Sequence, residues 1–254
     1  MKQINENELY LSYGDHFKRM LNELPSKQID MTIIKKYHMK PWMPEDMNAS
    51  ILDIGCGYGT QLYILSKLGY KKLYGIEIVK ESCSIAEKEV GRFANIEQSN
   101  AFAYLPNSIS KFDIIILNDV LEHIPREKVV ELLTLANKAL KVKGTIVIRV
   151  PNMSSLLGAY SMHLDFTHVN GFTEYSLMQV LDLGGFHEHN IIRNEYKLNI
   201  LNWRPWKSFK GLGLKSLLKY KLNEYLHRAI YSLRQQRPVP SVYDFNIEIY
   251  SKKI

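Results

Sequence analysis

Residues 51–60 read Ile51-Leu-Asp-Ile-Gly-Cys-Gly-Tyr-Gly-Thr60. A short run suited to a buried strand is followed at once by three glycines at alternate positions. Glycine adopts positive φ angles without steric cost and lets a ligand approach the backbone closely. In doubly wound α/β sheets, such a turn at the carboxyl end of the first strand lies in the ligand crevice. The stretch therefore predicts a strand, a ligand-binding turn and the start of a helix.

From Ser50 to about Val150, short apolar runs alternate with helix-like stretches. The runs are rich in β-branched residues and lack strict polar alternation, as is typical of strands buried on both faces. The predicted strands are Ile51–Ile54, Lys72–Ile76, Asn95–Gln98, Phe112–Leu117 and Gly144–Val150, followed later by His187–Tyr196 and Val242–Tyr250. The predicted helices are Gln61–Leu68, Glu81–Val90, Ala101–Leu105, Arg126–Leu140 and one that Thr173 caps and Gly184-Gly185 ends. This order predicts a doubly wound, mostly parallel seven-stranded α/β sheet.

The spacing of the glycines bears on the kind of ligand. A dinucleotide turn reads Gly-x-Gly-x-x-Gly and holds a pyrophosphate at the helix N-terminus. Here Thr60 stands at the third glycine position, and the glycine comes one residue early, at Gly59. Glu77 ends the second predicted strand 24 residues after Asp53, a spacing that suits an acid binding ribose hydroxyls. A tight turn without a ligand and a surface acid at a strand end are the structural alternatives.

The net charge of +7 is concentrated in one segment. Leu201–Pro240 contains nine Lys or Arg residues and one acid, Glu224, so it carries +8 and the rest of the chain sums to −1. The two cysteines, Cys56 and Cys83, argue against a disulfide framework. The N-terminal residues lack a signal-peptide pattern, and no run approaches the roughly 20 apolar residues that span a bilayer. We therefore expect a cytoplasmic protein.

Two motifs carry a resemblance to a known family. The acid-x-Gly-x-Gly-x-Gly turn resembles motif I of class I S-adenosylmethionine (SAM) dependent methyltransferases, and Phe112–Pro125 resembles their motif IV. The resemblance implies a Rossmann-like fold, SAM as the cofactor and S-adenosylhomocysteine (SAH) as the product. It places Asn100 and Ala101 at the adenine and the motif IV residues at the methionine end. The implied cofactor-binding residues are Asp53, Gly55, Cys56, Gly57, Gly59, Glu77, Ile78, Asn100, Ala101, Asn118, Asp119 and Leu121.

A narrower resemblance follows from later motifs. These are Val150-Pro-Asn, Asp165-Phe-Thr-His168, Phe172-Thr-x-x-Ser-Leu and Gly184-Gly-Phe186. They are similar to methyltransferases of bacterial capsule and lipopolysaccharide synthesis. This implies an O-methyltransferase acting on an anionic surface-polysaccharide precursor, such as a nucleotide-linked sugar or a capsular phosphoramidate group. An RNA or small-metabolite methyltransferase and a non-catalytic SAM-fold partner subunit are the alternatives, and the intact cofactor motifs argue against the last.

Methyl transfer from a sulfonium depends chiefly on alignment, which contributes roughly 7–11 kcal/mol. A hydroxyl acceptor also benefits from a nearby base, whereas an anionic oxygen needs only cations. His168 is the first candidate for acceptor binding or base, with His163 and Asp165 in support. His123 either reaches the active site or caps a helix. The His, Asp, His spacing lacks a thiolate or a fourth ligand, so we expect no metal site. A hydrogen-bond network that orders the loop is the structural alternative.

The basic segment combines Trp203-Arg-Pro-Trp-Lys-Ser-Phe-Lys210 with a helix-like run, Leu214 to Gln235. It suits a lid over an anionic substrate, contact with an anionic membrane surface, nucleic-acid binding or a docked helix with a charged outer face. We favour the lid, with Arg204, Lys207 and Tyr160 binding substrate and no stable nucleic-acid complex. The predicted organisation is a helical cap (1–48), a SAM-binding core (49–200), the basic insertion (201–240) and a final strand (241–254).

Overall fold

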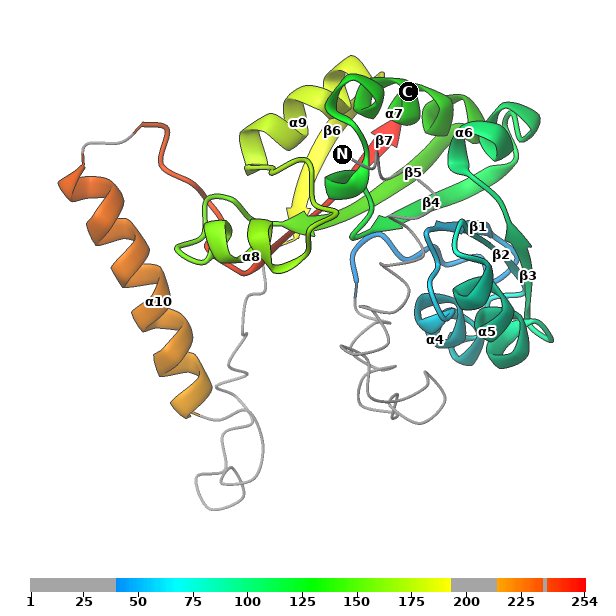
Figure 1. The fold of residues 1–254 in the computed structure, drawn as a ribbon, viewed down its shortest axis with the longest axis horizontal. Coiled ribbons are helices and arrows are strands. Elements are labelled where there is room, and N and C mark those ends of the chain that lie inside the picture. Colours follow the sequence, from blue (N-terminus) through cyan, green and yellow to red (C-terminus); the bar gives the residue numbers. More distant parts are fainter. Residues whose placement is uncertain (1–39, 193–213, 235–236) are drawn as a thin grey trace, which may run out of the picture.

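The computed structural model describes residues 40–192, 214–234 and 237–254. They contain a seven-stranded sheet with strand order β3-β2-β1-β4-β5-β7-β6 (Figure 1). The strands are β1 (Ser50–Ile54), β2 (Lys72–Glu77), β3 (Ala94–Gln98), β4 (Phe112–Asn118), β5 (Leu140–Pro151), β6 (Phe186–Ile192) and β7 (Asn246–Lys253). Strands β1 to β5 pair in parallel, whereas β7 runs antiparallel to β5 and β6. The predicted doubly wound, mostly parallel sheet is confirmed.

Helices cover both faces of the sheet. The helices α4 (Thr60–Leu68) and α5 (Lys80–Val90) lie against one face, and α7 (Val129–Ala139) and α9 (Glu174–Leu183) lie against the other (Figure 1). The connections also contain α6 (Ala101–Tyr104), α8 (Gly158–Leu164) and the 3₁₀ turns η1 (Leu105–Asn107), η2 (Leu121–His123) and η3 (Arg126–Lys128). Thr173 caps α9 as predicted, accepting a hydrogen bond from the Ser176 N–H.

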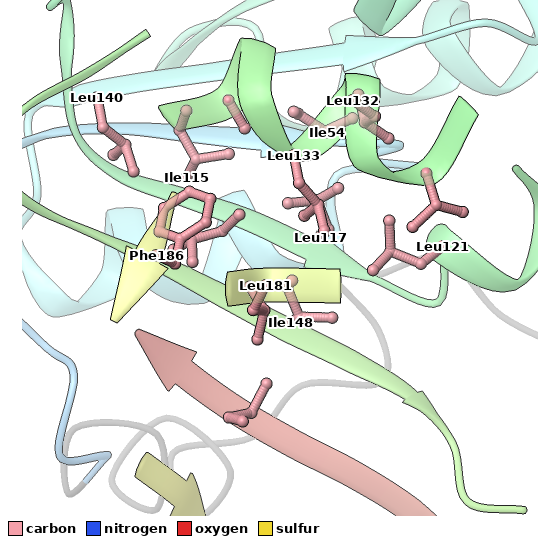
Figure 2. Close-up of a cluster of buried hydrophobic side chains, with 14 of the residues drawn as sticks. Ile54, Ile115, Leu117, Leu121, Leu132, Leu133, Leu140, Ile148, Leu181 and Phe186 are labelled. Carbon is pink, nitrogen blue, oxygen red and sulfur yellow. The ribbon is translucent and has the colours of Figure 1, made fainter. Parts of the chain in front are cut away.

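Burial on both faces explains the continuous apolar runs. In β4, Ile115 and Leu117 belong to the core under α7 and α9, whereas Ile114 and Ile116 belong to the core under α4 and α5. Successive side chains of a strand point to opposite faces of the sheet. A strand buried on both faces is therefore apolar at nearly every position and does not alternate apolar with polar residues. Figure 2 shows the first of these cores, in which Phe186 packs beside residues of β4 and α7.

Several element boundaries differ from the predictions; β5, for example, begins at Leu140 and not at Gly144. The final strand begins at Asn246 and not at Val242, because the Asn152 side chain binds the carbonyl oxygens of Val242 and Asp244 and holds that segment off the sheet. The predicted helix Arg126–Leu140 begins with the 3₁₀ turn η3 and ends at Ala139. Leu140 already pairs with Phe112 in the sheet, so it cannot continue the helix.

Most of the predicted N-terminal cap, residues 1–39, lies outside the described residues, as do residues 193–213 with Arg204 and Lys207. Of the cap, residues 40–48 are described. Trp42 is buried there, and its indole Nε1 donates to Glu248 of β7 at 3.3 Å, while Lys40 pairs with the same carboxylate. This segment is therefore attached to the sheet.

The helix α10 (Leu214–Leu233) stands beside the body near α8 (Figure 1). Three apolar side chains in the part of the helix whose side chains are described remain open to solvent: Leu222, Leu226 and Ile230 are 58%, 45% and 41% exposed. The contacts come instead from a polar face. His227 is buried, with Nε2 accepting from the Leu156 N–H at 2.9 Å, and the Tyr231 hydroxyl donates to the carbonyl oxygen of Ser154 at 3.1 Å. Among the described helices, none is long and apolar enough to cross a membrane.

We predict that Gly59→Ala destabilises the fold more than Gly69→Ala. Both glycines have positive φ, 83° and 101°, so alanine strains the backbone at either position. Only at Gly59 does the new Cβ also collide, 2.7 Å from Val90, whereas at Gly69 the nearest atom is 3.8 Å away. The collision adds about 1–3 kcal/mol to the loss of unfolding free energy. Urea unfolding of both variants measures the difference; equal losses would contradict the packing explanation.

Candidate functional site

The turn between β1 and α4 depends on its three glycines. Gly55, Gly57 and Gly59 have φ values of 68°, 54° and 83°, all in the left-handed region that other residues rarely adopt. The N–H groups of Gly55 and Cys56 both donate to the carbonyl oxygen of Ile76, and the Gly59 N–H donates to Cys56. The sequence folds into this turn because only glycine reverses the chain so sharply beside β2.

Glu77, at the end of β2, fixes the middle of the turn. Its Oε2 accepts the Gly57 N–H at 2.9 Å, and its Oε1 accepts the Val79 N–H at 2.8 Å. Burial raises the pKa of this carboxyl, and the backbone N–H groups of Val79 and Gly57 partly offset that rise. Each oxygen retains a further lone pair, and Glu77 lines a cavity. A buried carboxylate so placed can accept two vicinal hydroxyl groups.

The hydrogen bonds of the turn also select against a pyrophosphate. The N–H groups of Gly55, Cys56, Gly57 and Gly59 are all used within the protein, so these four cannot cradle a phosphate. A phosphate would in addition face the negative charge of Glu77. The turn therefore suits a nucleoside whose ribose meets Glu77 and whose remaining charge is positive.

The cavity lies at the carboxyl ends of β1, β2 and β4. It is lined by Ile54, Gly55, Ile76, Glu77, Ile78, Val79, Ser99, Asn100, Ala101, Phe102, Asp119, Val120, His123, Ile124, Pro125 and Lys128. Seven of the residues predicted to bind cofactor or to act in catalysis are among them: Gly55, Glu77, Ile78, Asn100, Ala101, Asp119 and His123. The structure thus brings together parts of four separate sequence motifs.

The other predicted cofactor residues do not line the cavity; most lie in the glycine turn beside it or in the hydrophobic core. Cys56, Gly57 and Gly59 build the turn and do not line the cavity. The Asn118 side chain points to Gln61, with its Nδ2 3.4 Å from Oε1. Leu121 is fully buried in the core under α7, so its side chain cannot line the methionine end as predicted. The reason is the 3₁₀ turn η2, which directs this residue inward.

Two acids flank the carboxyl end of β1. Asp53 is buried, and this burial together with the Glu77 charge raises its pKa to about 8, while Arg149 opposes the rise. Asp119 has a φ of 56° and forms an ion pair with Arg149 of β5, whose Nε lies 3.1 Å from Oδ1. The β1 end of the cavity is therefore rich in carboxyl groups, which favours a cationic ligand.

Two histidines from distant segments meet beside the cavity. The rings of His123, in η2, and His168, in the loop after α8, have centroids 4.8 Å apart. The Thr167 hydroxyl donates to Asp165 at 2.7 Å and lies 2.8 Å from Nδ1 of His123. His168 places its Nδ1 3.0 Å from the carbonyl oxygen of Ser161. Asp165 is thus joined to His123 through Thr167, whereas His168 meets His123 through its ring.

The hydrogen bonds fix which ring nitrogen carries the proton. Nδ1 of His168 faces a carbonyl oxygen, which only accepts, so this nitrogen donates and Nε2 bears the lone pair. Nδ1 of His123 faces both the hydroxyl and the carbonyl oxygen of Thr167 and must donate in the same way. Burial and the neighbouring His168 lower the pKa of His123 to about 4, so its ring is neutral near pH 7.

Glu122 is a candidate site residue that was not predicted from the sequence. It is 1% exposed, and neither carboxylate oxygen has a hydrogen-bond partner within the described part of the chain. Desolvation, with the nearby Asp119 charge, raises its pKa well above the usual range. The signal in the sequence was an acid next to a histidine, Glu122-His123, within an otherwise apolar stretch. Its burial could not be read from the sequence because η2 has no regular period.

His163 and Tyr160 are not brought into this cluster. Both lie on α8, where His163 is exposed and Tyr160 is 61% exposed. That His163 supports His168 stays a prediction; its side chain is exposed and is not among the groups that cluster with His168. Tyr160 stays a substrate-binding prediction at the surface.

Comparisons with known proteins agree with this geometry. A family model described as "Methyltransferase domain" matches residues 15–189. The fold is similar to a SAM-dependent methyltransferase from Archaeoglobus fulgidus (TM-score 0.65, 23% identity, covering 95% of this chain and 100% of that one). It is also similar to a phosphoethanolamine N-methyltransferase 2 of Haemonchus contortus, solved with SAH (TM-score 0.55, 16% identity, 85% and 51% covered). None of the curated proteins searched matches the chain.

The cofactor follows from the family and from the site. The residues present fit SAM, because the turn offers a ribose-binding acid and buried carboxyl groups but no free phosphate cradle among Gly55, Cys56, Gly57 and Gly59. The family match covers more than half of the chain. The chain therefore belongs to the methyltransferase family and is a class I SAM-dependent methyltransferase.

Proposed function

We propose that this enzyme methylates a hydroxyl oxygen of a small anionic acceptor, a precursor of a surface polysaccharide such as a nucleotide-linked sugar. The observation that carries the proposal is the pairing of His123 and His168 beside the cofactor cavity. A capsular phosphoramidate group is a second acceptor of the same charge class, and its oxygen needs no base.

The chain's carboxyl groups are arranged for the two ends of SAM. Glu77 binds the ribose hydroxyls with the lone pairs that its two backbone donors leave over. Asp53 and Asp119, at the ends of β1 and β4, attract the ammonium of the methionine part. SAM supplies a methyl group on a sulfonium, which is activated by its own charge. The protein's remaining task is to hold the acceptor oxygen in line with that methyl group.

The histidines suit a hydroxyl acceptor. Both Nδ1 atoms are held by Thr167 or Ser161, so each ring presents Nε2 as a hydrogen-bond acceptor in a fixed orientation. A hydroxyl group that donates to such a nitrogen points an oxygen lone pair toward the methyl group and loses its proton as the bond forms.

The basic insertion supports an anionic acceptor. Leu201–Pro240 carries +8, and α10 within it is attached through His227 and Tyr231 to the loop that follows β5. That loop leads into α8 and the His168 segment, at the same edge of the sheet as the cavity. This attachment supports a role of the insertion's positive charge in binding an anionic acceptor.

A label-transfer assay tests the proposal. The full-length protein is incubated with methyl-labelled SAM and, separately, with nucleotide-linked sugars, with RNA and with small amines such as histamine. We expect label only in the sugar pool, as a methyl ether. Label confined to RNA or to an amine would overturn the acceptor assignment, and absence of SAH binding in calorimetry would overturn the cofactor assignment.

We predict that His168→Asn lowers turnover of a hydroxyl acceptor by roughly 10²–10⁴. Asparagine can still donate to the Ser161 carbonyl, so the loop stays in place while the Nε2 lone pair is lost. Steady-state rates with saturating SAM measure the effect. His187→Ala, an exposed histidine on β6, is the control and should turn over normally. A loss of only a few fold in His168→Asn would point to an acceptor oxygen that is already anionic.

We predict that SAH binds more tightly as the pH rises from 6 to 8. The pKa of Asp53 is about 8 in the unliganded protein, so its ionised fraction, which alone attracts the ammonium, grows by up to about tenfold per pH unit below that value. Asp53→Asn should bind SAH more weakly at pH 8 and with a much shallower slope. Calorimetry at several pH values provides the measurement, with Glu97→Gln, an exposed acid on β3, as control. A slope that survives in Asp53→Asn would contradict the assignment.

A further inference from the structure

Glu122, His123 and His168 form a cluster that the methyl donor does not need. One ligand atom from each of the three residues lies within 4.8 Å of the other two. They come from two segments 45 residues apart, so the tertiary structure alone assembles them. Two imidazoles and one carboxylate are the ligand set of many sites for first-row divalent metals.

We propose that Glu122, His123 and His168 bind a divalent cation of the Mn²⁺ or Zn²⁺ type, which leaves open coordination positions for oxygen atoms of the acceptor. The sequence analysis expected no metal, because it considered only His163, Asp165 and His168. The structure replaces His163 and Asp165 with Glu122 and His123 as the partners of His168.

The supporting hydrogen bonds are those that metal-binding histidines require. Each ring donates through Nδ1, to the Thr167 oxygens in one case and to the Ser161 carbonyl in the other. This leaves Nε2 as the ligand atom of both rings. Asp165 in turn accepts the Thr167 hydroxyl proton at 2.7 Å. A carboxylate behind a ligating histidine orients the ring and raises its basicity.

Glu122 is the independent observation that points to a ligand. A carboxyl group that is 1% exposed and lacks a partner within the described residues is costly to the fold. A divalent cation would supply the missing interaction. Metal distances of roughly 2.0–2.2 Å are shorter than the spacing of the three ligand atoms allows, so cation binding would draw the three side chains closer together. The main-chain oxygen of Glu122 already accepts the N–H groups of Val169 and Asn170, which fixes the His168 loop against η2.

The position gives the cation a role in the proposed reaction. His123 lines the cofactor cavity, so a metal on its Nε2 would lie at the edge where the acceptor meets the methyl group. A hydroxyl oxygen bound to such a cation ionises more easily and is held at a fixed point. With the cation bound, both Nε2 atoms are ligands, so the cation replaces the free imidazole as the group that activates the hydroxyl, and the hydroxyl proton passes to water. The role rests on the proposed function, whereas the binding site itself does not.

Direct metal titration tests the site. Untagged full-length protein is freed of metal with EDTA, desalted and titrated with MnCl₂, with the six-line EPR signal of free Mn²⁺ and calorimetry as readouts. We expect one Mn²⁺ per chain, displaced by ZnCl₂. Loss of a residue that supports a metal ligand weakens metal binding by about 10–100-fold, and we expect Thr167→Val to fall within this range. Glu122→Gln and His168→Asn remove a ligand, so each should weaken binding more.

His163→Ala is the matched control and should bind Mn²⁺ like the wild type. SAH calorimetry and thermal unfolding are run on every variant, so a variant that does not fold is recognised and excluded. No binding by the wild type, or binding that Glu122→Gln and His168→Asn retain, would overturn the site. Loss of binding in His163→Ala would favour the His163, Asp165, His168 set instead. Failure to bind SAH would refute the proposed function while leaving the metal result intact.

Discussion

The pair of hydrogen bonds from Gly57 and Val79 to the buried Glu77 carboxylate is the interaction on which the rest of the site depends. It ties the first βα turn to the end of the second strand and consumes an N–H group that would otherwise face the ligand. The turn can reach Glu77 only because Gly55 and Gly57 have positive φ. Removing the carboxylate would leave two donors unpaired and would release the turn that forms one wall of the cavity.

Glu122 lies at the same edge of the sheet as Glu77, and its surroundings differ from those of Glu77. Glu77 has partners for both oxygens, whereas Glu122 has none within the described residues. Burial raises the pKa of both carboxyl groups, and the N–H groups of Gly57 and Val79 partly offset the rise at Glu77. Glu77 suits the cofactor, and Glu122, with His123 and His168, suits the acceptor side. This separation lets one family fold bind a constant methyl donor while the acceptor region differs.

The insertion α10 shows how a sequence pattern can mislead about docking. Leu222, Leu226 and Ile230 are exposed, because Asn223, His227 and Tyr231 make the contacts with the body in the part of the helix whose side chains are described. The polar contacts satisfy main-chain groups of the loop after β5 and of the segment before β7, which no apolar side chain could do. Leu222, Leu226 and Ile230 consequently stay exposed to solvent.

The sequence by itself determined the sheet, the glycine turn and the place of Glu77 at the end of the second strand, because these depend on local patterns. A strand buried on both faces must be continuously apolar, and a turn with positive φ must be glycine. It did not determine the burial of Glu122, the placement of Leu121 in the core or the exposure of His163. These depend on 3₁₀ and loop segments that have no period and whose side chains meet residues some 45 positions away. Only the tertiary structure decided that His123 and His168 lie side by side with Glu122, because packing of the loop after α8 against η2 brings them together.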